Sequence, residues 1–179
     1  MRRAIIGSWG RNHDPRCHAA GLRRGPDELE VHVKVYVASS WRNDYQPSVV
    51  AALREDGPEV YDFKDSEGFH WSEVDPDWKA WPQDIPKYLA GLRHPCAVRG
   101  FERDMGALRS CDACVYVMPC GVSASLEAGW ACGHGKPLIV YVPGVREPDL
   151  MVKMASLVTD SLQDVRDLLL GKPVCSPGA

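Results

Sequence analysis

The chain has 179 residues, of which 45% are hydrophobic and 25% are charged, and its formal net charge at neutral pH is −3. This length suits one well-buried core, and the lack of a basic excess argues against nucleic acid as a partner. The sequence shows no apolar run near the roughly 18 residues of a membrane-spanning helix, and its seven cysteines are irregularly spaced, so we expect a cytoplasmic protein with reduced thiols and no membrane partner.

The first half of the chain predicts two strands around one helix. Residues 1–31 lack hydrophobic periodicity, which predicts a loosely structured extension. VHVKVYVASS (31–40) predicts a strand, and the polar turn SSWRND leads into an amphipathic helix in YQPSVVAALREDG that ends at Gly57. PEVYDF (58–63) predicts a second strand. Residues 64–95 are acidic, rich in Trp and Pro and without a steady period, which favours a long functional loop or lid.

The second half alternates helices and strands. We expect a helix over about 97–111, a strand in ACVYVMP (113–119), a helix over about 123–134, a strand in PLIVYVP (137–143) and a closing helix near SLQDVRDLLLG (161–171). This order predicts an α/β fold: a Rossmann-like or flavodoxin-like doubly wound, mostly parallel sheet of about five strands with helices on both faces. We expect a single domain over 32–172 and a tail over 173–179.

Two carboxylates stand where packing alone does not call for them. The predicted helix 97–111 has an inward stripe of Ala97, Phe101, Leu108 and Cys111, and Asp104 occupies the missing position of that stripe. A simpler explanation is that Asp104 lies at the flank of the helix, where its carboxylate reaches solvent. Glu127 is expected just inside the first turn of its helix, where the spacing forms no capping box, although the positive helix end would favour a carboxylate there.

The two carboxylates together indicate a reaction at an oxocarbenium-like carbon. Ligand sites in such sheets lie beyond the carboxyl ends of the strands, where Asp104 and Glu127 are both expected. One carboxylate can attack or stabilise C1 while the other handles a proton, as in the cleavage of a glycosidic bond.

The turns before two helices are candidate anion sites. Ser39 and Ser40 in the first turn, and Ser123 and Ser125 in the second, offer hydroxyl groups beside the free backbone N–H groups of a helix start. Arg42 adds a positive charge to the first turn. Routine helix capping explains the serines equally well. The cysteines of CDAC (111–114), with Cys120, Cys132 and His134, were weighed as zinc ligands. No second C-x-x-C pair follows, so core thiols are favoured and no metal is predicted.

Three segments carry a resemblance to a known family. VYVASSWRN, ERDMGALRSCDACVYVMP and VSASLEAGWACGHGKPLIVY resemble the nucleoside 2-deoxyribosyltransferase family, including its deoxynucleoside 5′-monophosphate N-glycosidase branch, over about residues 34–155. The resemblance implies that Glu127 is the nucleophile at C1′, that Asp104 contacts the sugar hydroxyl and assists proton transfer, and that Tyr36 lies close to the nucleophile. It implies no cofactor. The implied substrate-binding residues are Ser39, Ser40, Trp41, Arg42, Gly121, Ser123 and Met154.

The resemblance also implies a homodimer or a larger homo-oligomer, in which 149–154 face the pocket of a neighbouring copy. The sequence departs from the family in two places. The turn before Glu127 is one residue shorter and reads VSAS in place of a Gly-rich stretch, and the Trp-rich segment has no counterpart.

The leading hypothesis is an enzyme that cleaves the N-glycosidic bond of a (deoxy)nucleoside or its 5′-monophosphate, by hydrolysis or by transfer of the sugar to another base. One alternative is a phosphoribohydrolase resembling the cytokinin-activating group, but its PGG-x-GT-x-x-E pattern is absent. A second alternative is a module that senses a nucleotide without turning it over.

Overall fold

The computed structural model describes residues 33–174 except 66–67 and 145–146, so the predicted extension 1–31 and nearly all of the predicted tail lie outside the described residues. The chain divides into two compact units. The sheet unit comprises the residues up to Tyr61 and those from Cys111 onward, and the helical unit comprises Asp62–Ser110. Each is described by itself, and the assignment of one domain to 32–172 stays a prediction.

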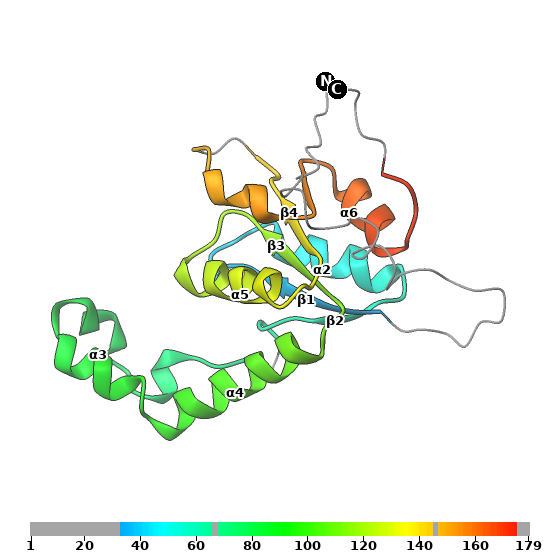
Figure 1. Cartoon of the computed structure of the whole chain (residues 1–179). Helices are drawn as coiled ribbons and strands as arrows, with labels where there is room; N and C mark the ends of the chain where they lie inside the picture. The colour runs from blue at the N-terminus through cyan, green and yellow to red at the C-terminus, as the bar shows by residue number, and fades with distance from the viewer. Residues whose placement is uncertain (1–32, 66–67, 145–146, 175–179) are drawn as a thin grey trace. The chain divides into compact units, whose positions relative to one another are not determined.

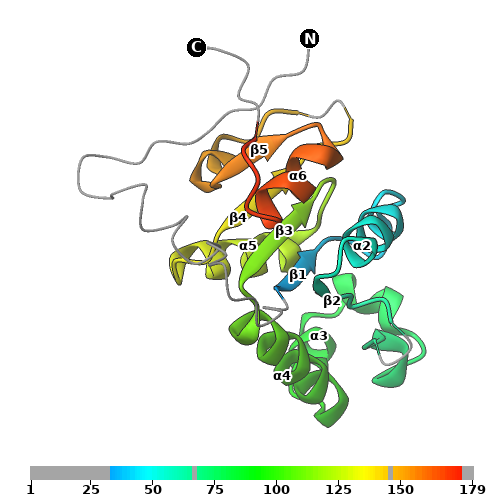
Figure 2. The same ribbon diagram turned by 90° about the vertical axis from the view of Figure 1, so that its right-hand side faces the viewer.

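The sheet unit contains five parallel strands, which confirms the predicted fold class. They are β1 (Lys34–Ala38), β2 (Glu59–Tyr61), β3 (Ala113–Val117), β4 (Leu138–Tyr141) and β5 (Leu157–Thr159). Every pairing is parallel, and the order across the sheet is β2-β1-β3-β4-β5 (Figure 2). The sequence predicted the first four of these strands individually and did not locate β5.

Helices cover both faces of this sheet (Figure 1). On one face, valines and other aliphatic residues of the strands form the core with α2 (Gln46–Glu55) and α6 (Leu162–Leu169). Successive side chains of a strand point to opposite faces, so Tyr36 and Cys114 point to the other face. There α5 (Val122–Gly133) packs through its buried Ala124, Ala128 and Ala131.

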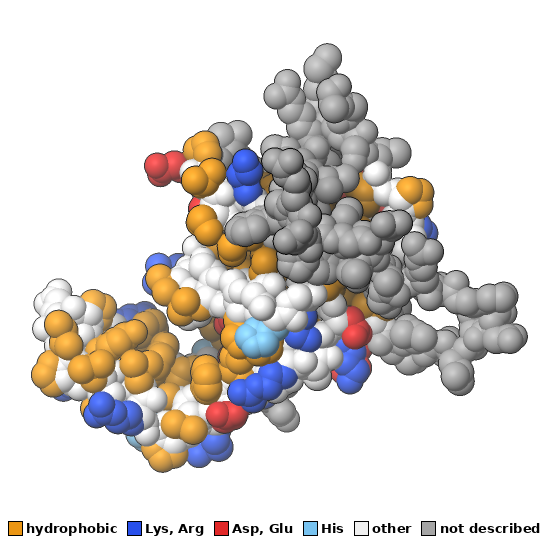
Figure 3. Space-filling view, viewed as in Figure 1, with side chains coloured by type: hydrophobic (Ala, Val, Ile, Leu, Met, Phe, Trp, Pro, Cys, Tyr) orange, Lys and Arg blue, Asp and Glu red, His pale blue; other side chains and the backbone are white. Residues whose placement is uncertain are grey.

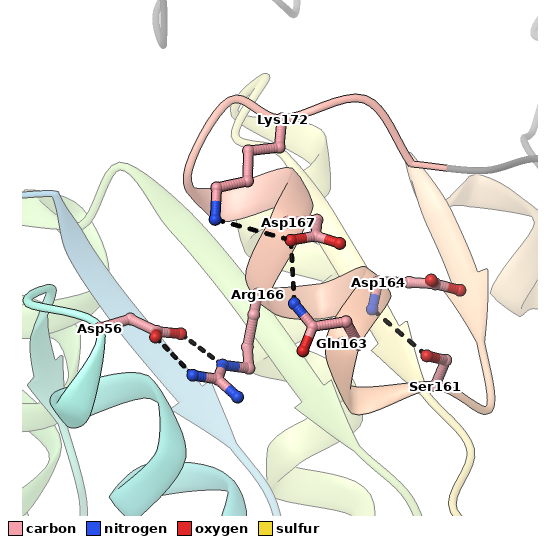
Figure 4. A network of polar contacts seen from close by, with 7 residues as sticks. All are labelled: Asp56, Ser161, Gln163, Asp164, Arg166, Asp167 and Lys172. Carbon is pink, nitrogen blue, oxygen red and sulfur yellow. Dashed lines mark hydrogen bonds and ion pairs between the residues drawn. The ribbon is translucent and has the colours of Figure 1, made fainter.

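A bidentate ion pair joins α6 to the end of α2 (Figure 4). Arg166 donates from Nε and Nη2 to the two carboxylate oxygens of Asp56, with the Nη2 bond at 2.6 Å. The hydrogen bonds and positive charge of the Arg166 guanidinium hold the pKa of Asp56 below its ordinary value. At the start of α6, the Ser161 hydroxyl accepts a bond from the backbone N–H of Asp164 at 3.3 Å, which is a typical helix cap.

The helical unit shows that the Trp-rich segment is not structureless. It forms η2 (Trp71–Glu73), η3 (Trp78–Gln83) and α3 (Ile85–Gly91), followed by the long α4 (Pro95–Ser110). Trp71 contacts Phe69 and Trp81 edge-on at centroid distances of 4.9 and 5.4 Å. Trp81 is buried, and its indole N–H donates to Asp75 at 2.9 Å. Aromatic packing around short turns leaves no helical or strand period in the sequence.

The inward stripe predicted for α4 is partly wrong. Ala97 and Leu108 are buried as expected, but Phe101 is 58% exposed. The buried position beside Phe101 is Gly100, where an added Cβ would lie 2.8 Å from atoms of Phe69. Phe69 therefore packs against α4 at Gly100, one position before Phe101. Among the described residues, no helix is long and apolar enough to cross a membrane.

Candidate functional site

The carboxyl ends of β1 and β3 form the topological switch point of the sheet. From β1 the chain crosses to β2 on one side, whereas from β3 it crosses to β4 on the other side. Sheets of this order bind ligands in the crevice outside such strand ends. The two turns that leave these strands, residues 39–45 and 118–121, are called the switch-point turns below.

Asn43 ties the two switch-point turns together. Its Nδ2 donates to the carbonyl oxygens of Val117 at 2.9 Å and Pro119 at 3.0 Å. Its Oδ1 accepts from the backbone N–H groups of Tyr45 at 2.8 Å and Gln46 at 3.2 Å. Asn43 is 2% exposed, so this buried side chain fixes both the turn after β1 and the start of α2. The sequence placed Asn43 in a candidate turn but did not single it out.

The candidate anion-binding residues after β1 divide into an inner and an outer set. Ser39 is buried, and its hydroxyl donates to the carbonyl of Val117 at 2.9 Å. Ser40 lies farther out, where its hydroxyl accepts from the backbone N–H of Arg42 at 3.2 Å. Trp41 and Arg42 are exposed. Ser39 thus closes the base of the turn, and the other three are the ones that can face a ligand.

The turn after β3 leads into α5 one residue earlier than predicted. Gly121 is the N-cap, and it carries no side chain to accept from the first-turn N–H groups, which have no partners within the helix. Ser123 is exposed in that first turn. The hydroxyl of Ser125 lies 2.8 Å from the Tyr116 hydroxyl and donates to the Gly121 carbonyl at 3.1 Å. The exposed groups beside Gly121 and Ser123 are therefore positioned to meet an anion.

Glu127 lies in the second turn of α5, so its predicted place in the first turn is wrong. It is the sixth helical residue after the Gly121 cap. The field of a helix end falls off within one turn, so the helix end does not account for this carboxylate. Glu127 is half-buried between the buried Ala124 and Ala128. Its side chain therefore leaves the helix close to the sheet.

Cys114 and Tyr36 show which part of the sheet Glu127 lies near. Burial raises the pKa of the Cys114 thiol well above its ordinary value, and the charges of Cys111 and Glu127 raise it further. Cys114 is the register partner of Tyr36, and such partners share a face of the sheet. Tyr36 is fully buried, and its ring stacks on Tyr61 at 5.2 Å. The structure thus brings Tyr36 and Glu127 to the same face of the sheet.

Cys120 lies in the turn after β3, and the sequence analysis considered it as a metal ligand but favoured a core thiol. Its thiol donates to the Val117 carbonyl at 2.8 Å. Burial raises the pKa of Cys120 to about 11, hydrogen bonds with Tyr116 and Ser39 oppose that shift, and the charge of Glu127 adds to it. The thiol is therefore protonated at neutral pH. Cys120 is thus a neutral group in the turn after β3, hydrogen-bonded to the last residue of that strand.

Two further predicted site residues, Asp104 and Met154, are described within their own units. Asp104 is on α4 of the helical unit, where its side chain is 30% exposed and its Oδ1 lies 3.6 Å from Nη2 of Arg103. Its approach to Glu127 stays a prediction. Met154 ends η4 (Leu150–Met154) in the sheet unit, and its carbonyl accepts from the Cys132 thiol of α5 at 3.5 Å. The proposed role of Met154 toward a neighbouring copy likewise stays a prediction.

Metal-ligating side chains do not gather in the described part of the chain. There, no three His, Cys, Asp or Glu side chains are arranged to hold a metal ion. Cys111 and Cys114 of the CDAC segment are both buried. The Lys136 ammonium donates to the Cys111 carbonyl at 2.5 Å, which places a cation beside this cysteine.

Comparisons with known proteins show the fold. No family model matches the chain. No curated protein matches it in a sequence search. Among solved structures, it is similar to a 2-deoxyribosyltransferase from the psychrotolerant bacterium Bacillus psychrosaccharolyticus, described as a biocatalyst for the synthesis of antiviral and antitumoral nucleosides. The two share 19% identity with a TM-score of 0.54, over 80% of this chain and all of that one.

Proposed function

We propose that this protein cleaves the N-glycosidic bond of a (deoxy)nucleoside or of its 5′-monophosphate, with Glu127 as the nucleophile. The observation that carries the proposal is the position of Glu127 on α5, near the Tyr36–Cys114 pair and the switch-point turns. The fold shared with a 2-deoxyribosyltransferase supports the same reaction class. A fold alone does not assign chemistry, so the carboxylate and its surroundings are the stronger support.

The proposed reaction proceeds in two displacements at C1′. The Glu127 carboxylate forms a bond to C1′ while the bond from C1′ to the base nitrogen breaks, and the base leaves with that electron pair and takes up one proton. Asp104 is the proposed proton donor. Water, or a nitrogen of a second base, then attacks C1′, loses its own proton and releases Glu127 as a carboxylate. Water gives hydrolysis, and a second base gives transfer.

The surrounding residues have proposed roles in binding. Tyr36 supports the nucleophile from the sheet. A 5′-phosphate would meet the outer switch-point turns, where Ser40, Arg42 and Ser123 offer hydroxyl groups and one positive charge. The exposed ring of Trp41 in the same turn can stack on the sugar or base. No cofactor enters this chemistry.

The reaction is tested with a panel of nucleosides, deoxynucleosides and their 5′-monophosphates, with and without free adenine, by chromatography of the released or exchanged base. Glu127→Gln should lower turnover by at least about a thousandfold. Glu55→Gln is the matched control, because Glu55 is exposed at the end of α2 and should retain full activity. Equal turnover by Glu127→Gln and wild type would reject Glu127 as the nucleophile.

The nucleotide-sensing alternative gives a different result in the same experiment. Calorimetry with the same panel measures binding independently of turnover. If wild type and Glu127→Gln both bind a nucleotide tightly and wild type forms no product from any compound, the protein is a sensor and the enzymatic proposal fails.

The proposal includes a second copy of the chain. Exposed apolar side chains gather at the start of α5 and on η4 (Figure 3), where Val122 is 78% and Leu150 is 74% exposed. Apolar patches of this kind are typical of protein interfaces. Sedimentation at micromolar concentration should therefore show a dimer or larger species, and a purely monomeric sample would contradict this part of the proposal.

A further inference from the structure

A pocket of about 290 Å³ lies entirely within the helical unit. This volume is at the lower end of the range for small-ligand sites. The helix α4 contributes Cys96, Arg99, Gly100 and Arg103 to its walls, and the segment around η2 contributes Phe69 and Glu73. The proposed reaction at Glu127 uses none of these residues.

Helical spacing places the α4 residues of the pocket on one flank of the helix. Positions 96, 99 and 103 are separated by three and four residues, and position 100 lies four after 96 and three before 103, so these residues follow one another along successive turns. Gly100 lies between the two arginines, and Phe69 packs against it at the place a Cβ would occupy. Because Gly100 has no side chain, Phe69 can pack directly against α4, and it lines the same pocket as Arg99 and Arg103.

The charges of the pocket favour an anion. Arg99 donates through Nη2 to the thiol of Cys96 at 3.1 Å, and a thiol is a weak acceptor. Arg103 also lines the pocket, and its Nη2 lies 3.6 Å from Oδ1 of Asp104. Glu73 is the one carboxylate among the residues lining the pocket, and its Oε1 accepts from the backbone N–H of His70 at 2.9 Å. Two arginines and one carboxylate thus line the pocket.

We propose that this pocket binds a phosphate group, held by Arg99 and Arg103 from successive turns of α4. The planar guanidinium fork matches two oxygens of a phosphate, and charge-assisted bonds of this kind are stronger than the bond to a thiol that Arg99 makes otherwise. The phosphate is either free inorganic phosphate or the phosphate of a nucleotide. The pocket has more volume than a phosphate alone requires, so part of an attached group fits as well.

Binding of inorganic phosphate to the full chain tests the proposal without reference to turnover. Calorimetric titration at constant ionic strength, balanced with chloride, should show saturable binding. Arg99→Gln and Arg103→Gln should each weaken it by about tenfold or more. Arg109→Gln is the matched control, because it removes the same charge from α4 at a residue that pairs with Glu102 at 3.5 Å and does not line the pocket.

An NMR titration of the wild-type protein tests the same proposal without depending on whether the variants fold. The Nε–Hε resonances of Arg99 and Arg103 should shift as phosphate is added, while that of Arg109 should not. The proposal is overturned if binding is not saturable, if the Arg99 and Arg103 variants bind as wild type, or if Arg109→Gln weakens binding equally.

A parallel titration with AMP distinguishes the two sources of the phosphate. If AMP binds more tightly than phosphate and loses that advantage in Arg99→Gln and Arg103→Gln, the pocket is a nucleotide site. If the two bind equally and both weaken in these variants, it is a site for free phosphate. If both variants bind AMP as tightly as wild type does, AMP binds at another site and the pocket is not a nucleotide site.

Discussion

Replacing Asn43 by Asp should destabilise the protein at the two switch-point turns that Asn43 holds together. The two side chains have nearly the same shape, and Asp retains the oxygen that accepts from Tyr45 and Gln46. It replaces the amide that donates to Val117 and Pro119 by a second carboxylate oxygen. Asn43→Asp therefore turns two hydrogen bonds into two repulsive contacts between oxygens.

The expected cost follows from those two contacts. A buried carbonyl that loses its donor costs about 1–3 kcal/mol, so two carbonyls cost about 2–6 kcal/mol before any repulsion is counted. Val117 keeps the donors of Ser39 and Cys120, which favours the lower half of that range. The loss is still a large fraction of the roughly 5–15 kcal/mol by which a domain is stable.

The destabilisation should depend on pH. A carboxylate held against two carbonyls has a folded-state pKa above its unfolded value of about 3.9. The penalty is therefore complete above the folded pKa, and it fades as the pH falls toward the unfolded value, since the protonated acid can donate to one carbonyl.

Urea unfolding followed by tryptophan fluorescence, at several values between pH 4 and pH 8, measures this effect. Ser39→Ala is the control, because it removes one hydrogen bond to the same Val117 carbonyl and introduces no charge; it should cost about 1 kcal/mol at every pH. The reasoning is refuted if Asn43→Asp is as stable as wild type at pH 7, or if its deficit grows as the solution is acidified.

Three further predictions concern stability and reactivity. Asp56→Asn should lower the melting temperature at pH 7, and its gap to wild type should close as the pH falls below about 3.9 and through the lowered folded pKa of Asp56; a gap that stays constant to pH 2 in circular dichroism melts would contradict this. Cys120, with a pKa raised from 9.0 to about 11, should have about 100-fold less thiolate than an ordinary thiol at pH 7.5 and should react with iodoacetamide correspondingly slowly, as peptide mass spectrometry would show. Gly91→Ala places a Cβ 2.3 Å from two ring carbons of Trp81 and should cost about 1–3 kcal/mol in urea unfolding, whereas Gly106→Ala, whose Cβ meets nothing within 4 Å, should be neutral or stabilising.

Three of the four strands that the sequence predicted share one property, which is an apolar side chain on both faces. β1, β3 and β4 are short apolar runs between polar turns, and the prediction located each of them. β2 and β5 have only three residues each, and the prediction located β2 but not β5. The place of β5 at the sheet edge depends on pairing with β4, which no local signal encodes.

The helical unit departs furthest from its prediction. Its short helices are held by Trp81 packed against Gly91 and by Phe69 packed against Gly100. Such contacts join residues that are 10 to 31 positions apart, so they leave no short-range period to read. Phe101 is exposed although its spacing fits the predicted buried stripe, and the adjacent Gly100 is buried instead.

The candidate site was predicted where it depends on the fold class and missed where it depends on tertiary contacts. A parallel α/β sheet already directs attention to the turns after β1 and β3, so the sequence offers Ser39, Ser40 and Arg42 as candidates, and their roles stay a prediction. The roles of Asn43 and Cys120 depend on the Val117 carbonyl. Asn43 reaches it from the end of another strand, and only the order of the strands brings the two together.

Small residues on α5 explain how a carboxylate comes to lie beside the sheet. Ala124, Ala128 and Ala131 are buried against it, and their short side chains let the helix approach closely enough that Glu127 is half-buried. Burying a carboxylate costs free energy, and in the second turn neither a cap nor the helix end offsets that cost. If a residue is retained for chemistry at the expense of stability, replacing it by a neutral residue should abolish activity without destabilising the protein. Glu127→Gln should therefore unfold in urea at the same or a higher midpoint than wild type while turnover is lost, and a variant that is less stable by more than about 1 kcal/mol would instead mark Glu127 as a structural residue.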